Sequence, residues 1–130
     1  MYLIQCVNAY EAVLAMSREE HSYKLAYAIA TLKRRLQPHV DFFTRSEYKL
    51  VEEYAQRDEN GKVILNENVS FNFTDPNKAG EYERRRGELG MMEVNEAIEI
   101  LVAPPPETIK PVYLEALDGF IEFEDIGGAE

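Results

Sequence analysis

The fold is decided by SREEHSYKLAYAIATLKRRLQPHVDFFTRSEYKLVEEYAQRD, which occupies Ser17–Asp58. Apolar side chains recur in this stretch every three or four residues, as on one face of an α-helix. They are Leu25, Ile29, Leu32, Leu36, Val40, Phe43, Leu50 and Tyr54, with Glu47 in the one vacant place. From Leu25 to Tyr54 the accumulated rotation is roughly 2900°, about 20° from eight full turns. We therefore predict one long helix, about 60 Å in length at 1.5 Å per residue.

The ends and the middle of this predicted helix carry specific signals. Ser17 and Glu20 have the spacing of a capping box, so the helix is predicted to begin at Ser17. Asp58–Gly61 has the turn chemistry that ends a helix. Pro38 removes a backbone donor and costs about 3 kcal/mol inside a helix, yet the apolar face keeps its phase on both sides of it. We predict a kinked helix, and two helices meeting at Gln37 are the alternative.

A hairpin and a second helix are predicted to follow the long helix. Lys62–Leu65 and Ser70–Phe73 are short runs of alternating apolar residues, which is typical of a β-hairpin. Asp75 then offers an N-cap before Pro76, so a second helix is predicted to run from there to about Glu93. Its length matches the second half of the long helix. We predict an antiparallel helical pair whose tip carries the hairpin.

Smaller elements are predicted at both ends of the chain. Tyr2–Val7 has the pattern of a short strand and Ala9–Met16 that of one or two helical turns. Ala97–Val102 is predicted to be a strand that ends at the triple proline. Lys110 and Pro111 open a short helix that Gly119 ends, with Val112, Leu114, Leu117 and Phe120 or Ile121 facing inward. The expected fold is α+β, mainly α, in a single domain 1–130 with an acidic C-terminal tail over about 122–130.

Composition limits the possible partners. Asp and Glu outnumber Lys and Arg by 24 to 14, and the net charge of −10 opposes non-specific attraction to nucleic acid or anionic lipid. Cys6 is the only cysteine, so neither a disulfide nor a cysteine zinc site is possible within the chain, which fits a reducing cytoplasm. The chain has no apolar window long enough for a membrane span. We expect a soluble protein with no membrane partner.

Residues with catalytic chemistry do not form a recognisable motif. His21 and His39 lack a metal-ligand spacing, and no serine or cysteine lies in a nucleophile motif. The glycines form no phosphate-binding loop. Acidic pairs such as Glu52 and Glu53 are expected on solvated helix faces. We therefore expect a protein that is not an enzyme, with no metal and no cofactor.

Two basic triplets are the strongest binding candidates. They are Lys33, Arg34 and Arg35, and Arg84, Arg85 and Arg86. Three consecutive helical residues fan across some 200°, so neither triplet makes a flat patch by itself. Acidic neighbours offer i,i+4 pairs such as Glu81 with Arg85. Local ion pairs are the first interpretation, and contact with an acidic partner or a phosphate is the second.

The first half of the long helix offers a third candidate surface. Its apolar face is formed by Leu25, Ile29, Leu32 and Leu36. The predicted second helix covers only the other half. This face therefore needs the N-terminal segment, the closing helix or a second copy of the protein, and a homo-oligomer through the long helix is one possible outcome.

The whole pattern resembles a family of small phage and prophage proteins of unknown function, found mainly in tailed phages of Gram-positive bacteria. The resemblance lies in the entry Ser22–Ala26, the helical run that follows, the exit Glu53–Gly61 and the closing helix after Lys110. Pro38 and the triple proline depart from the family pattern. The resemblance implies a phage-encoded accessory protein in the cytoplasm of a bacterial host, without an assigned activity.

Two functions are consistent with these observations. The first is protein–protein interaction, as an inhibitor of a host defence or replication protein or as a virion-assembly factor. The second is nucleic-acid binding through the arginine triplets, which the acidic net charge disfavours.

Overall fold

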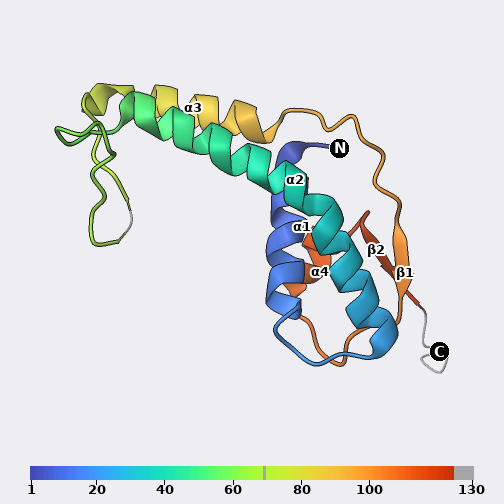
Figure 1. The fold of residues 1–130 in the computed structure, drawn as a ribbon. Coiled ribbons are helices and arrows are strands. Elements are labelled where there is room, and N and C mark those ends of the chain that lie inside the picture. Colours follow the sequence, from blue (N-terminus) through green and yellow to red (C-terminus); the bar gives the residue numbers. More distant parts are fainter. Residues whose placement is uncertain (69, 125–130) are drawn as a thin grey trace.

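The chain folds into a head and an arm that project from one another at an angle (Figure 1). The computed structural model describes residues 1–68 and 70–124. Within them the protein is mainly helical, with four α-helices and one parallel pair of short strands. The head consists of α1 (Leu3–Met16), the first half of α2 (Tyr23–Tyr54), α4 (Pro111–Leu117), β1 (Leu101–Ala103) and β2 (Ile121–Phe123). The arm consists of the second half of α2, the segment 56–78 and α3 (Ala79–Gly90).

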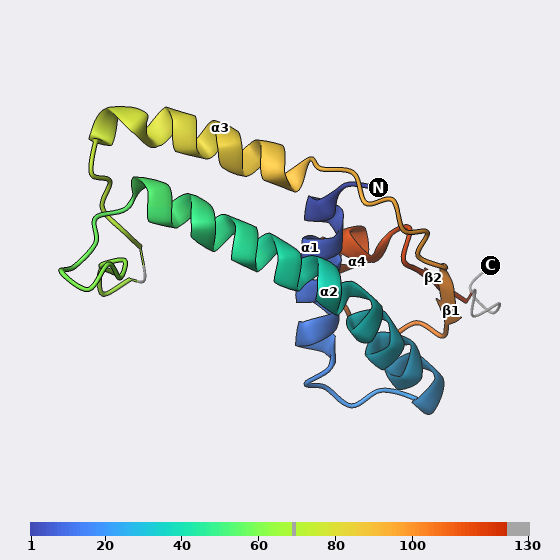
Figure 2. The same ribbon diagram turned by 45° about the horizontal axis from the view of Figure 1, so that its top comes forward.

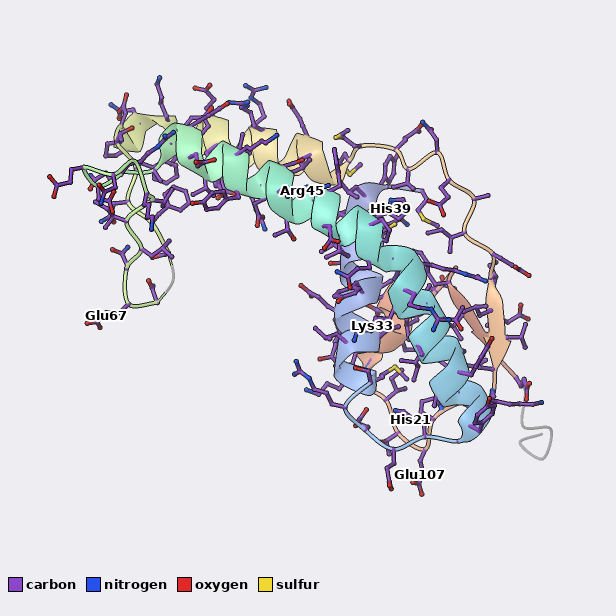
Figure 3. The ribbon with its side chains drawn as sticks, viewed as in Figure 1. His21, Lys33, His39, Arg45, Glu67 and Glu107 are labelled. Carbon is purple, nitrogen blue, oxygen red and sulfur yellow. The ribbon has the colours of Figure 1, made fainter. Side chains whose placement is uncertain are left out.

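Helix α2 (Tyr23–Tyr54) connects the head and the arm. It continues through Pro38, as the phase of the apolar face predicts, and its ribbon changes direction near His39 (Figure 3). The predicted start at Ser17 is wrong. Ser17 lies at the C-terminal end of α1, and the helix begins after Ser22, whose hydroxyl accepts from the backbone N–H of Leu25 at 3.4 Å.

The predicted end of α2 also lies a few residues too late. The backbone becomes extended at Ala55, whose isolated antiparallel bridge to Phe73 replaces a further helical turn. The turn chemistry of Asp58–Gly61 is used in the connection that follows, where Gly61 has a φ of +81°.

Helix α1 (Leu3–Met16) replaces the predicted N-terminal strand. Its buried positions recur at helical spacing: Leu3, Cys6, Ala9, Ala12, Val13 and Met16. A short apolar run such as Tyr2–Val7 fits either a strand or a buried helix, and here packing against α2 selects the helix. The side-chain oxygen of Gln5 accepts from the N–H of Tyr2 at 2.7 Å and satisfies one free donor at the helix start.

The core of the head is formed by α1, the first half of α2, α4 (Pro111–Leu117) and the two strands. Leu32, Leu36 and Leu117 are fully buried in it. Of the residues predicted to face inward from the closing helix, Leu117, Phe120 and Ile121 are buried, whereas Val112 and Leu114 are exposed. A helix of seven residues has only one short face to offer the core.

The sheet consists of β1 (Leu101–Ala103) and β2 (Ile121–Phe123), which run parallel. Leu101 pairs with Ile121, and the N–H of Leu101 donates to the carbonyl of Phe120 at 3.0 Å. Helix α4 makes the crossover that a parallel pair requires. Strand β2 lies where an acidic tail was predicted, and residues 125–130 of that tail lie outside the described residues.

The arm pairs the second half of α2 with α3 (Ala79–Gly90), which runs back alongside it (Figures 1 and 2). A 3₁₀ turn, η1 (Pro76–Lys78), precedes α3, and the Asp75 carboxylate accepts from the N–H of Asn77 at 3.0 Å, in the predicted N-cap position. The helix stops at Gly90, earlier than predicted.

The predicted antiparallel hairpin is not formed as a pair of strands. In the described part of the chain the only strand pair is parallel, and the segment at the arm tip has isolated bridges such as Leu65 to Phe71. Polar side chains take up backbone groups there: Asn68 accepts from the N–H of Ser70 at 3.3 Å. Such local hydrogen bonds compete with a strand ladder.

Candidate functional site

The end of the arm has a small core of its own, separate from that of the head. Tyr82 of α3 is buried there against Leu50 and Tyr54 of α2. The Tyr82 ring meets those of Tyr54, Phe71 and Phe73 edge to face, at centroid distances of 5.7, 5.4 and 5.6 Å. Such contacts hold the segment at the arm tip against the two helices.

An apolar hollow of about 610 Å³ opens beside this cluster. This apolar hollow is lined by residues of α2, of the segment at the arm tip and of α3. They are Glu47, Tyr48, Val51, Val63, Leu65, Ser70, Phe71, Phe73, Tyr82, Glu83 and Arg86. Leu65 on its wall is 56% exposed, and the neighbouring Ile64 is 45% exposed. The arm core is therefore incompletely covered on this side.

Ion pairs to α2 fix α3 along the arm. Arg86 donates to the carboxylate of Glu47 at 2.7 Å, and this hydrogen bond raises the pKa of the Arg86 guanidinium. Arg85 pairs with Glu53 and also contacts the hydroxyl of Tyr54 at 3.1 Å. The pair of Arg86 with Glu47 belongs to the lining of the apolar hollow, and the pair of Arg85 with Glu53 lies outside that lining.

The second basic triplet is thus engaged within the protein, although not in the predicted way. Arg84 pairs with Glu88 at 2.9 Å in an i,i+4 pair. The predicted pair of Glu81 with Arg85 is not formed, because Glu81 accepts from the Tyr54 hydroxyl at 2.9 Å instead. Local ion pairing, the first interpretation of the sequence, is confirmed for Arg84 alone, whereas Arg85 and Arg86 pair with carboxylates of α2.

The first basic triplet lies in a different setting. A second hollow, of about 750 Å³, lies at the bend of α2 and is lined by Lys33, Arg34, Gln37, Pro38, Asp41 and Arg45. We call it the basic hollow. Lys33, Arg34 and Arg45 have no ion-pair partner within residues 1–68 and 70–124. Arg35 turns away from it and donates to the carbonyl of Glu99 at 3.5 Å.

A chain of hydrogen bonds fixes the neutral and acidic groups of the basic hollow. The Tyr10 hydroxyl of α1 donates to the side-chain oxygen of Gln37 at 2.8 Å, and the Gln37 amide donates to Asp41 at 2.9 Å. The head therefore orients two side chains of this surface. Figure 3 labels Lys33 on the first half of α2 and Arg45 on the second.

The third candidate surface is buried, which corrects the prediction of an interface there. Leu25, Ile29, Leu32 and Leu36 are at most 2% exposed, because α1, β1 and α4 cover them within the chain. These four side chains are not available to a second copy of the protein. The outward face of the same half of α2 presents Tyr23, which is 83% exposed.

The two histidines lie apart and have different partners. Figure 3 shows His39 near the bend of α2 and His21 at the far end of the head. His39 contacts Glu96 at 3.1 Å, and His21 contacts the carbonyl of Met16 at 3.0 Å. No three His, Cys, Asp or Glu side chains of the described residues come together in a way that could hold a metal ion. Burial raises the pKa of the Cys6 thiol, which lies inside the head core.

The apolar hollow was not predicted from the sequence, although the alternating apolar residues that line part of it are visible there. The alternation of Val63, Leu65, Phe71 and Phe73 predicts a hairpin, and in the structure these four side chains line the apolar hollow. Tyr48 and Tyr82 join them from helices that are remote in the sequence. Only the tertiary structure brings the three segments together.

Comparison with models of protein families, with curated proteins and with solved structures finds no match to this chain. Among the helices that the structure describes, none is both long enough and apolar enough to span a membrane.

Proposed function

We propose that this chain is a non-enzymatic accessory protein that acts by binding another protein through its arm. The observation that supports this best is the open apolar hollow beside Tyr82, because it lies on the arm, which extends away from the head. Concave apolar surfaces with a few polar groups at the rim are typical of binding sites. Leu65 and Ile64 are not part of the head core, and both side chains are exposed. They are therefore free to contact a partner.

The ion pairs across the arm support this proposal. Arg85 with Glu53 and Arg86 with Glu47 hold α3 on α2 while the neighbouring apolar wall stays uncovered. A surface that is rigid before binding loses less conformational entropy when a partner docks. The pairs are exposed, so we assign them positioning rather than a large share of stability.

The family resemblance supplies the biological setting of the proposal: a phage-encoded protein in the cytoplasm of a bacterial host. Within that setting the partner is either a host defence or replication protein, which the chain inhibits, or a virion component, which it helps to assemble. The identity of the captured partner distinguishes the two.

Nucleic-acid binding through the arginine triplets is less well supported. Arg84, Arg85 and Arg86 are each paired with a carboxylate of the protein itself. A phosphate would have to displace these partners, and the net charge of −10 opposes its approach.

The experiment is quantitative capture from a lysate of phage-infected bacteria, with Leu65→Asp as the test variant. Burying a leucine contributes about 1.5–3 kcal/mol, so its loss is expected to lower the captured partner by about tenfold or more. Val112→Asp is the matched control, because Val112 is an equally exposed apolar residue on the head.

Mass spectrometry of the captured proteins gives the readout, and circular dichroism checks that both variants fold. A partner that is retained by the control and lost with Leu65→Asp supports the proposal. Equal capture by all three proteins, or capture of nothing, contradicts it.

A further inference from the structure

We infer that the basic hollow and the apolar hollow form one continuous binding surface for a single protein segment that carries acidic residues beside apolar ones. The inference rests on the proposed function and specifies the chemistry of the partner. It assigns a role to Lys33, Arg34 and Arg45, which the fold itself does not use in ion pairs among the described residues.

Helix geometry makes the two hollows neighbours. Arg45 lines the basic hollow and Tyr48 lines the apolar hollow, and residues three apart on a helix are adjacent on its surface. From Lys33 to Val51 the helix rises about 27 Å at 1.5 Å per residue. One helical partner segment, or one extended segment of about eight residues, spans that distance.

Charge determines what kind of segment fits. The basic hollow presents three cations and one carboxylate, whereas the protein as a whole has a net charge of −10. In the second triplet every arginine is paired with a glutamate of the protein, whereas Lys33, Arg34 and Arg45 line one hollow without such a partner among the described residues. An acidic segment matches the cations there, and its apolar residues match the wall around Leu65 and Phe71.

Asp41 favours a polypeptide over a nucleic-acid strand. Its carboxylate lines the basic hollow between the cations and is oriented by Gln37. A phosphodiester backbone has only acceptors along its edge and is repelled by this charge, whereas a peptide offers N–H donors to it. The apolar ring of Pro38 in the same hollow also suits a side chain better than a phosphate.

The test is selection of a random peptide library against the whole protein, followed by affinity measurement of the enriched peptides by fluorescence anisotropy. We expect enriched peptides to combine Asp or Glu with Leu, Ile or Phe. The double variant Arg34→Glu/Arg45→Glu is expected to bind them about tenfold or more weakly, because attraction becomes repulsion at two contacts. Arg18→Glu/Lys24→Glu is the control, since it makes the same change in net charge away from the basic hollow and is expected to bind as the wild type does.

Three results would overturn the inference: enriched peptides without acidic residues, no enriched peptide, or equal affinity for Arg34→Glu/Arg45→Glu. A single-stranded oligonucleotide that binds with the same dependence on Arg34 and Arg45 would replace the protein partner with a nucleic acid. A dimer in sedimentation that this double variant abolishes would replace it with a second copy.

The outcomes separate this inference from the proposed function. Peptides that need Leu65 but ignore Arg34→Glu/Arg45→Glu would leave the arm as a binding surface and refute only the acidic partner. Lysate capture that ignores Leu65 would refute the proposed function itself.

Discussion

Tyr82 is the residue on which the arm core converges. Its ring lies edge to face with three other aromatic rings, and only 7% of its surface is exposed. Burial raises the pKa of its hydroxyl, and the nearby carboxylate of Glu47 acts in the same direction. The arm core thus contains a group that resists ionisation while the arm is folded.

This shift predicts an alkaline loss of arm stability. The unfolded chain ionises Tyr82 at the ordinary tyrosine pKa of about 10, and the folded chain only at higher pH. The contribution to stability is therefore present below that ordinary value and is lost as the pH rises towards the folded pKa. Tyr82→Phe, which keeps the ring, is expected to reduce this dependence when unfolding is followed at increasing pH. An unchanged pH profile would contradict the assignment.

The ion pairs of Arg84, Arg85 and Arg86 were predictable from the sequence only in part. The acidic neighbours of the second triplet correctly predicted one local ion pair, that of Arg84 with Glu88. The other two partners, Glu53 and Glu47, come from α2, more than 30 positions away. Periodicity cannot identify a partner on another helix, because the rotation of α3 about its own axis is set by packing.

Two of the three glycines of helix α3, Gly87 and Gly90, have different surroundings. A Cβ added at Gly87 meets no atom within 4 Å, whereas one added at Gly90 lies 3.2 Å from the Cβ of Ile4. The contact at Gly90 lets the end of α3 approach α1 closely. Glycine therefore has a packing reason at Gly90 and none at Gly87.

Alanine at these two positions gives a matched test. Gly87→Ala is expected to stabilise α3 by about 0.5–1 kcal/mol, because alanine is the better helix former. Gly90→Ala is expected to gain nothing, because Ile4 must shift to make room. Hydrogen exchange of the α3 amides measures both, and an equal gain would show that the α1 contact is unimportant.

The spacing of apolar residues predicts some helices and strands of this fold and not others. Helix α2 was predictable through Pro38 because its apolar face is long and in phase. The strand predicted at Tyr2–Val7 was wrong because a short apolar run has no preferred period of its own. Strand β2 was missed because Glu122 and Glu124, which alternate with its inward residues, were interpreted as a solvated tail.

In the part of the chain that the structure describes, two hydrophobic cores share helix α2. The head core takes Leu25 to Leu36 of α2, and the arm core takes Leu50 and Tyr54. The head core is the larger and includes several fully buried side chains. A single domain over residues 1–130 stays a prediction, and the stability of the two cores decides it.

Two core truncations are expected to behave differently. Leu32→Ala is expected to cost about 2–5 kcal/mol and to lower the protection of the whole protein, because it opens a cavity in the head. Tyr82→Ala is expected to expose the amides of α3 and leave those of α1 protected. Hydrogen exchange of both variants checks this, and equal loss in head and arm would mean that the two cores unfold together.

The bend at Pro38 turns α2 into a lever. The second half of the helix, from Pro38 to Tyr54, is about 24 Å long at 1.5 Å per residue, so a change of about ten degrees at the bend moves the arm tip by about 4 Å. Leu65 lies beyond that tip, and Arg34 lies before the fulcrum. The angle at the bend therefore sets the distance between Leu65 and Arg34. The close approach of Gly90 to Ile4, together with the hydrogen bond from the N–H of Leu3 to the carbonyl of Met92, ties that angle to the head.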